Sequence, residues 1–175
     1  MSEPGHEQTM AAAAAAAAAA DPTTVGPVRG PIPRQGRLLG VDYGRRRIGL
    51  AICDPQRRIA SPVATIPNNP AMITRFRQLV TENAVVGIVV GLPLHAHGEE
   101  SEMSAEARRF ATWLAAEVHL PVVMWDERYT SAAAESVLLD THLTQRQRKA
   151  RVDRVAAQML LQTYIEAGAP AHGSE

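Results

Sequence analysis

The sequence has only one cysteine, Cys53, and aromatic residues make up only 4% of its 175 residues. A single cysteine excludes an intrachain disulfide framework and a cysteine-rich zinc site. It also makes a reducing, cytoplasmic setting the default expectation. So few aromatic side chains argue against a surface on which the bases of single-stranded nucleic acid stack.

The chain also has no net charge, only one lysine and no long apolar run. The formal net charge is +0 at pH 7, so no overall field favours a polyanionic partner. Lys149 is the only lysine, and the other basic residues are arginines, whose planar guanidinium suits bidentate contact with carboxylates and phosphates. The alanine tract at residues 11–20 is half the length of a membrane span, which needs about 20 residues. We therefore expect no membrane partner.

The first 36 residues differ in composition from the rest of the chain. The alanine tract is followed by a segment rich in proline, glycine and threonine. Glu3, His6 and Glu7 precede the tract, where a signal peptide would have basic residues. We expect residues 1–36 to be a disordered tail, with either Met1 or Met10 as the true start. Residues 37–168 are then expected to form one domain, and residues 169–175 a short flexible tail.

Hydrophobic patterning in that domain predicts three strands, followed by alternating helices and strands. Pro62 interrupts the third strand, which indicates an edge position or a bulge, and Ser101 is a plausible N-cap. The expected strands are 37–43, 47–54, 59–66, 85–90 and 122–125, and the expected helices are 72–83, 101–118, 130–139 and 152–167. We expect residues 141–150, which are polar and basic, to be mobile.

This order of elements is that of the ribonuclease H-like fold. It predicts an α/β protein in which three antiparallel strands are extended by two parallel strands. The resulting mixed five-stranded sheet would be flanked by helices. The run at residues 85–90 is apolar throughout, as expected for a parallel strand buried on both faces.

Three acidic positions lie where this arrangement lets them meet. Asp42 ends the first strand, Glu127 ends the last strand with Asp126 beside it, and Asp153 opens the last helix. Aspartate is depleted in strands, so Asp42 is either a turn residue or a ligand. Successive strand residues point to opposite faces, so only one of Asp126 and Glu127 can face Asp42, and the choice stays open. Asp153 could instead only complement the positive end of its helix.

If these carboxylates converge, their mutual repulsion raises a pKa unless a cation is present. A set of oxygen ligands without histidine or thiolate indicates Mg²⁺ or Mn²⁺. Two such ions about 3.5–4 Å apart form a common clamp for phosphodiester hydrolysis. Asp42, Glu127 and Asp153 are therefore the candidate catalytic and metal-binding residues.

Basic residues flank each of these acids. Phosphate contacts from such residues position a nucleic acid without reading its sequence. Residues 146–151 taken alone favour a solvated charged loop, but the pairing of each acid with neighbouring arginines favours substrate contact. The flanking residues are Arg45, Arg46 and Arg47 beside Asp42, Arg128 beside Glu127, and Arg146, Arg148, Lys149, Arg151 and Arg154 around Asp153. We expect substrate contacts from Arg45, Arg46, Arg47, Arg128, Thr130 and Arg151.

Four segments resemble the YqgF/RuvX family, which comprises Holliday junction resolvase-like nucleases of the ribonuclease H-like superfamily. The segments are GVDYG at residues 40–44 with RIGLA at 47–51, VVGLP at 89–93, DERYTS at 126–131 and VDRVAA at 152–157. The resemblance covers residues 37–165. It makes Asp42, Glu127 and Asp153 the counterparts of the expected catalytic acids. Related resolvases carry an acid at the end of the fourth strand, where this chain has Gly91.

The resemblance implies a cytoplasmic, metal-dependent nuclease that processes the 5′ end of pre-16S ribosomal RNA during ribosome biogenesis. Its implied partners are structured RNA and the pre-ribosomal small subunit, and we expect a monomer or a weak homodimer. Two alternatives stay open: a nuclease for branched DNA, or a non-catalytic nucleic-acid-binding assembly factor on the same fold. An ATPase lobe that begins with a similar Asp-x-Gly turn is disfavoured, because such enzymes need a second lobe.

Overall fold

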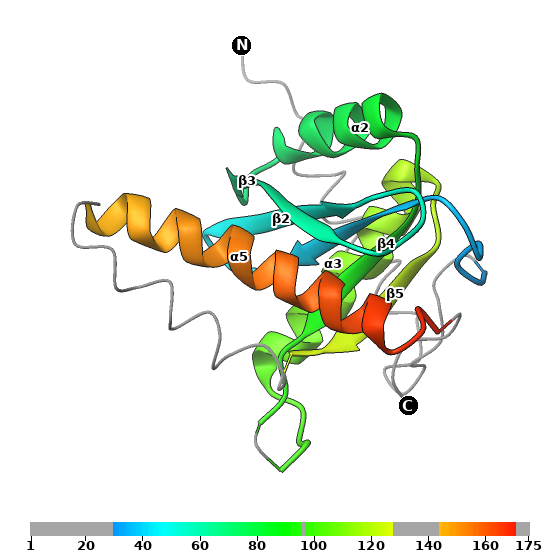
Figure 1. The fold of residues 1–175 in the computed structure, drawn as a ribbon. Coiled ribbons are helices and arrows are strands. Elements are labelled where there is room, and N and C mark those ends of the chain that lie inside the picture. The colour runs from blue at the N-terminus through cyan, green and yellow to red at the C-terminus, as the bar shows by residue number, and fades with distance from the viewer. Residues whose placement is uncertain (1–29, 96, 128–143, 171–175) are drawn as a thin grey trace.

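The computed structural model describes residues 30–95, 97–127 and 144–170, which form one sheet covered by helices on both faces (Figure 1). The elements are β1 (Arg37–Asp42), β2 (Arg47–Cys53), β3 (Ala60–Pro67), α2 (Met72–Asn83), β4 (Val85–Leu92), α3 (Glu102–Val118), β5 (Val122–Asp126) and α5 (Gln145–Glu166). The helix expected at residues 130–139 lies outside the described residues.

The sheet has the strand order β3-β2-β1-β4-β5. Strand β2 pairs antiparallel with both β1 and β3, whereas β4 pairs parallel with both β1 and β5. This arrangement is that of the ribonuclease H-like fold, so the predicted fold class is confirmed. The apolar run of β4 lies inside the sheet, and all but one of its residues are buried.

Strand β3 is an edge strand, which is one of the two arrangements that Pro62 indicated. It lies at one end of the strand order, and its pairing with β2 shifts in register between Leu50 and Ala51, which face Ala64 and Pro62. The extra residue, Val63, forms a bulge. Both an edge position and a bulge therefore accommodate the proline.

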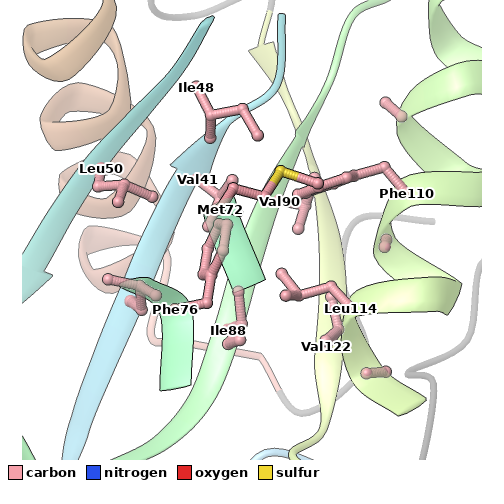
Figure 2. Packing of buried hydrophobic residues seen from close by; sticks show 14 of the residues in the cluster. Val41, Ile48, Leu50, Met72, Phe76, Ile88, Val90, Phe110, Leu114 and Val122 are labelled. Carbon is pink, nitrogen blue, oxygen red and sulfur yellow. The ribbon is translucent and has the colours of Figure 1, made fainter. Parts of the chain in front are cut away.

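Helices α2 and α3 cover one face of the sheet (Figure 2). Phe76 from α2 and Leu114 from α3 are fully buried in the same cluster as Val41 and Val90 of the central strands. Burial of each such side chain contributes about 1.5–3 kcal/mol. Ser101 caps α3 as predicted, because its hydroxyl accepts a hydrogen bond from the Ser104 backbone N–H.

Helix α5 covers the opposite face (Figure 1). Its buried residues Ala157, Leu161 and Tyr164 pack with Leu38 of β1 and Val89 of β4. The helix lies very close to the sheet: a Cβ atom added at Gly40 would be 2.8 Å from the Leu161 Cβ and 2.9 Å from the Ala157 carbonyl oxygen. Glycine at the centre of β1 is therefore what lets α5 pack at this distance.

The start of α5 corrects one prediction. We expected residues 141–150 to be mobile and the helix to begin near Val152, but the helix begins at Gln145. Residues 141–143 lie outside the described residues. Thr144 and Gln147 form a capping box, in which each side chain bonds the other residue's backbone N–H. The following glutamine, arginine and lysine residues are good helix formers, so the basic segment is helical from its cap.

Residues 30–36, which we assigned to the tail, contact the domain. Ile32 is buried with Leu38 and Val89 in the cluster beneath α5. The Arg57 guanidinium donates hydrogen bonds to the Gly36 carbonyl oxygen at 2.8 Å and the Pro33 carbonyl oxygen at 2.5 Å. This stretch therefore contributes a residue to the core. The alanine tract lies outside the described residues.

Candidate active site

Asp42 lies at the end of β1, between two glycines on neighbouring strands. On one side it pairs with Gly49 of β2. On the other side Val41 pairs with Val90 of β4, and this register places Gly91 beside Asp42. All three positions belong to the face of the sheet that α5 covers, because Gly40, two residues before Asp42, contacts α5 on that face. The half-buried Asp42 carboxyl thus stands between two positions without side chains.

The Glu127 side chain lies over Gly91. A Cβ atom added to Gly91 would be 2.0 Å from Glu127 Oε1, so the carboxyl group of Glu127 occupies the space beside Asp42. Asp126, at the end of β5, is buried and precedes Glu127 by one residue. The sequence left open whether Asp126 or Glu127 faces Asp42, and in the structure it is Glu127 that lies beside Asp42.

The Asp42 and Glu127 carboxyl groups interact directly, and the pKa of each is raised above its ordinary value. Burial raises the pKa of Asp42 well above its usual value, and the nearby charges of Glu127 and Asp153 raise it further. Burial also raises the pKa of Glu127, while a hydrogen bond from the Asp42 carboxyl opposes that change. The pair therefore resists holding two negative charges at once.

Asp153 reaches this site from α5. A Cβ atom added to Gly49 would be 1.9 Å from the Asp153 carbonyl oxygen, so the first half of the helix lies directly on the strand that pairs with Asp42. The Asp153 carboxyl accepts a hydrogen bond from Arg47 Nε at 2.7 Å. Its charge contributes to the raised pKa of Asp42, which places it near the pair.

The three acids share one site but are not arranged as a ready metal cage. Within the described ranges, no group of three or more His, Cys, Asp or Glu side chains is arranged to hold a metal ion. The donor set nevertheless fits a hard divalent cation, because it consists of carboxylate oxygens and two of the groups repel each other when ionised. The third carboxylate, that of Asp153, forms an ion pair with Arg47.

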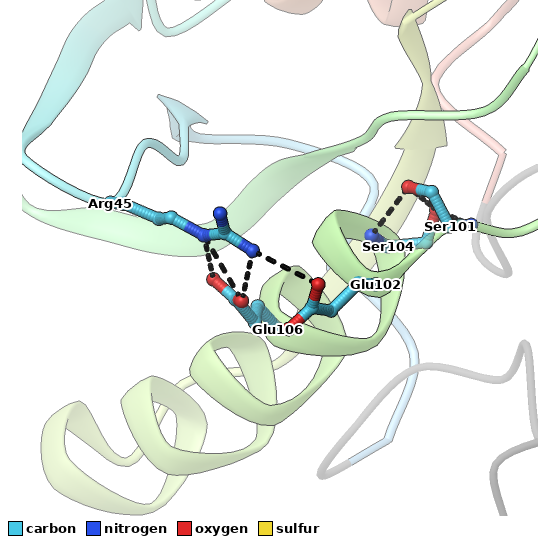
Figure 3. A network of polar contacts seen from close by, with 5 residues as sticks. All are labelled: Arg45, Ser101, Glu102, Ser104 and Glu106. Atoms are coloured by element: carbon cyan, nitrogen blue, oxygen red, sulfur yellow. Dashed lines mark hydrogen bonds and ion pairs between the residues drawn. The ribbon is translucent and has the colours of Figure 1, made fainter.

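Arg45 is engaged with acids of α3 (Figure 3). Its guanidinium donates from Nη2 to Glu106 at 2.7 Å and from Nε to both Glu106 oxygens at 3.1 Å. Glu102 lies 3.5 Å from the same Nη2. The positive charge of Arg45, which we expected to contact a substrate, is therefore partly neutralised by these acids. The same contacts join the β1–β2 turn to α3.

The remaining predicted substrate contacts lie in different places. Arg46 is exposed in the turn after β1, and Arg47 and Arg151 are half-buried. Arg151 lies two residues before Asp153 on α5, in the basic first half of that helix. Arg128 and Thr130 lie outside the described residues. Arg46, Arg47 and Arg151 thus flank the acidic site from the turn and from the helix.

Sequence reasoning missed three features of this site. It did not foresee that Gly49 and Gly91 make room for the other two acids, nor that Arg47 pairs with Asp153. Gly91 carried the one available signal, since an apolar strand that ends in glycine often marks a close approach of another group. The two contacts themselves join residues far apart in the sequence, and no spacing rule predicts them.

Comparison with known proteins supplies the assignment. A model of the family described as "RuvX: Holliday junction resolvase" matches residues 36–167. A protein of Rhodopirellula baltica named "Putative pre-16S rRNA nuclease" is 43% identical over 148 residues, which cover 83% of this chain and 86% of that protein. The chain belongs to the RuvX family.

A second curated relative agrees with this assignment. A protein of Chloroflexus aggregans with the same name is 45% identical and covers 74% of this chain and 93% of its own length. Among solved structures, the chain is similar to Thermus thermophilus RuvC in complex with a Holliday junction substrate, with 14% identity and a TM-score of 0.49 over 78% of this chain and 98% of that one. The family is described as a Holliday junction resolvase and these curated relatives are named as nucleases, which is the class of enzyme that hydrolyses phosphodiester bonds.

None of the helices in the described ranges is both long enough and apolar enough to cross a bilayer.

Proposed function

We propose that this chain is a metal-dependent endonuclease that processes the 5′ end of pre-16S ribosomal RNA. The single observation that carries the proposal is the contact between the Asp42 and Glu127 carboxyl groups at the end of β1, with Asp153 nearby. The names of the curated relatives support the choice of RNA substrate. Residues 37–168 are the proposed nuclease domain, which agrees with the range that the family model matches.

In this proposal Asp42, Glu127 and Asp153 are the catalytic acids and hold Mg²⁺ or Mn²⁺. Bound there, the metal would activate a water molecule and stabilise charge on the leaving oxygen. The raised pKa values of Asp42 and Glu127 support this role, because a divalent cation would relieve the repulsion that the pair experiences without it. Asp153 would join Asp42 and Glu127 as a metal ligand by releasing Arg47, or by contacting Arg47 and the cation at the same time.

The arginines that flank the acids would hold the phosphate backbone across the site. Arg46 and Arg47 approach from the turn after β1, and Arg151 approaches from α5. We include Arg45, Arg128 and Thr130 as further substrate contacts. Arg45 would first have to leave Glu106. Such contacts position a nucleic acid but do not select a sequence, so RNA structure or the pre-ribosomal small subunit would supply the specificity. We further propose a cytoplasmic protein that is a monomer or a weak homodimer.

A second candidate substrate is a four-way DNA junction, which the description of the matching family model favours. A third candidate, a non-catalytic assembly factor, would bind nucleic acid on the same surface without cutting it. Replacing Asp42 separates binding from cleavage, since asparagine keeps the size of the side chain and removes its charge.

The test compares wild type with Asp42→Asn on precursor ribosomal RNA and on a four-way DNA junction, with Mn²⁺ or with a chelator. We expect wild type to cut the RNA at a defined site only with metal, and Asp42→Asn to bind it without cutting. Preferential cutting of the junction would establish the second candidate. Equal cleavage by both proteins would contradict the assignment of Asp42, and binding without any cleavage would establish the assembly factor.

A further inference from the structure

Both strand neighbours of Asp42 are glycines that the backbone conformation does not require. Gly30, Gly36, Gly98 and Gly168 are the described glycines with positive φ, so Gly49 and Gly91 have ordinary strand conformations. Glycine within a strand weakens it, because it adds no packing and loses more conformational freedom on folding. The reason why positions 49 and 91 are glycine must therefore lie in what occupies the space where a side chain would be.

At Gly91 that space contains the end of the Glu127 side chain. An added Cβ atom would lie 2.0 Å from Oε1, 2.7 Å from Cδ and 2.8 Å from Cγ of Glu127. Nonbonded carbon and oxygen atoms do not approach so closely, since the attractive range for such pairs begins near 3.5 Å. Any residue other than glycine at this position would therefore displace the Glu127 carboxyl from Asp42.

At Gly49 the space contains the backbone of α5. An added Cβ atom would lie 1.9 Å from the Asp153 carbonyl oxygen and 3.0 Å from the Arg154 nitrogen. A helix backbone cannot move aside as a side chain can. Gly49 thus determines how closely the helix that carries Asp153 approaches the strand pair that carries Asp42.

We propose that Gly91 and Gly49 are positioning residues of the nuclease site: their missing side chains bring Glu127 and Asp153 to Asp42. The inference rests on the proposed function, since it is the reaction of that site that the two glycines would serve. Gly91 gives the sharper test, because it contacts a side chain and its replacement need not disturb the fold.

The test replaces Gly91 by alanine in the full-length chain. We expect kcat for the RNA substrate to fall about 100-fold, as for other small misplacements of a catalytic group, with little change in KM. Binding of Mn²⁺, measured by calorimetry on the protein alone, should weaken. The matched control is Gly87→Ala on the same strand and face, where the added Cβ would meet side-chain atoms of Ile32 and Leu38 at 3.2 Å. It should leave kcat and Mn²⁺ binding unchanged.

A second variant separates positioning from a general packing defect. In a Glu127→Ala background the side-chain atoms nearest to an added Cβ at Gly91 are gone, so adding Gly91→Ala should lower neither the unfolding midpoint nor the residual activity. If Gly91→Ala lowers the unfolding midpoint equally with and without the Glu127 side chain, another neighbour is responsible and the inference is wrong.

The outcomes distinguish this inference from the proposed function. Wild type that cleaves, together with a Gly91→Ala variant that cleaves and binds Mn²⁺ as well as wild type, would overturn the inference and leave the function standing. Wild type that cleaves neither RNA nor junction DNA would contradict the proposed function and remove the reaction that the glycines would serve.

Discussion

Arg47 donates from Nε to Asp153 Oδ2 at 2.7 Å, which joins the start of β2 to α5 beside the Asp42–Glu127 pair. The two residues are 106 positions apart in the sequence. Their side chains are 35% and 24% exposed, so the ion pair is only partly screened by water. It holds the third acid of the site at a defined place in the absence of metal.

We predict that this ion pair stabilises the metal-free protein. Arg47→Gln and Asp153→Asn should each lower the free energy of unfolding in chelator, with a coupling of about 0.5–1 kcal/mol between them. Urea unfolding of the two single variants and the double variant measures this coupling. The neighbouring Arg46→Gln serves as control and should change stability by less than about 0.5 kcal/mol. Additive effects of Arg47→Gln and Asp153→Asn would show that the pair contributes nothing.

Asp42→Asn should make the metal-free protein more stable while it abolishes cleavage. The folded pKa of Asp42 is raised by burial and by Glu127. Its contribution to stability is therefore full below the pKa of an unfolded aspartate, about 3.9, and is lost as pH rises through the folded pKa. The variant should be more stable than wild type at neutral pH, and the gain should shrink as pH is lowered toward the pKa of an unfolded aspartate. Thermal unfolding in chelator from pH 4 to pH 8 measures this difference.

Asp54 provides a control of opposite sign. Its carboxylate accepts hydrogen bonds from the backbone N–H groups of Arg58 at 2.7 Å and Ile59 at 2.8 Å, and these bonds lower its pKa. Asp54→Asn should therefore destabilise the protein at neutral pH, and its effect should disappear as pH falls through the lowered pKa. If both variants shift stability in the same direction over this pH range, the electrostatic description of Asp42 is wrong.

Gly49→Ala should destabilise the protein by about 1–3 kcal/mol or more, the usual range for overpacking. The added methyl would collide with the Asp153 carbonyl oxygen at 1.9 Å, so either α5 or β2 has to move. Chemical denaturation measures the loss, and hydrogen exchange should show it as faster exchange in the first half of α5. Gly87→Ala, whose neighbours are side-chain atoms at 3.2 Å, should lose less. Equal losses in the two variants would contradict the close approach of α5 at Gly49.

Releasing Arg45 should strengthen nucleic-acid binding. Glu106 and Glu102 currently share its guanidinium, so Glu106→Gln would free positive charge beside the site. We expect tighter RNA binding and a salt dependence steeper by about 0.7–0.9 in the slope of log K against log salt, the value for one added phosphate contact. Arg45→Ala is the matched opposite change. Filter-binding titrations at several salt concentrations test this, and an unchanged slope in Glu106→Gln would show that Arg45 lies away from the RNA.

Much of the fold could be predicted from sequence because its signals are local. The apolar run in β4, the proline in β3 and the Ser101 cap each act within a few residues, and each was found where predicted. The start of α5 was missed because the basic composition of residues 145–151 suggested a solvated loop. The reciprocal bonds of Thr144 and Gln147 determined the boundary, and a capping pair of this type was not sought there.

The acidic positions of the candidate site were also recognisable, because Asp42, Glu127 and Asp153 end or begin elements that the fold brings together. The contacts among them were not. Whether Asp126 or Glu127 faces Asp42 depends on how β5 ends relative to β4. The spaces above Gly91 and Gly49 depend on packing between β4, β5 and α5. These are tertiary distances of a few ångströms. In the sequence, a glycine that leaves space for a neighbouring side chain or backbone cannot be told from a glycine in a turn.

The central claim is that Asp42, Glu127 and Asp153 form one metal-binding centre for phosphodiester hydrolysis. Anomalous diffraction from crystals of the wild-type protein soaked in Mn²⁺ tests it most directly. We predict an anomalous peak coordinated by carboxylate oxygens of Asp42 and Glu127, with Asp153 turned from Arg47 toward it, and no peak there in Asp42→Asn crystals. A wild-type protein that cleaves RNA with Mn²⁺ but shows no anomalous peak among these three side chains would contradict the claim.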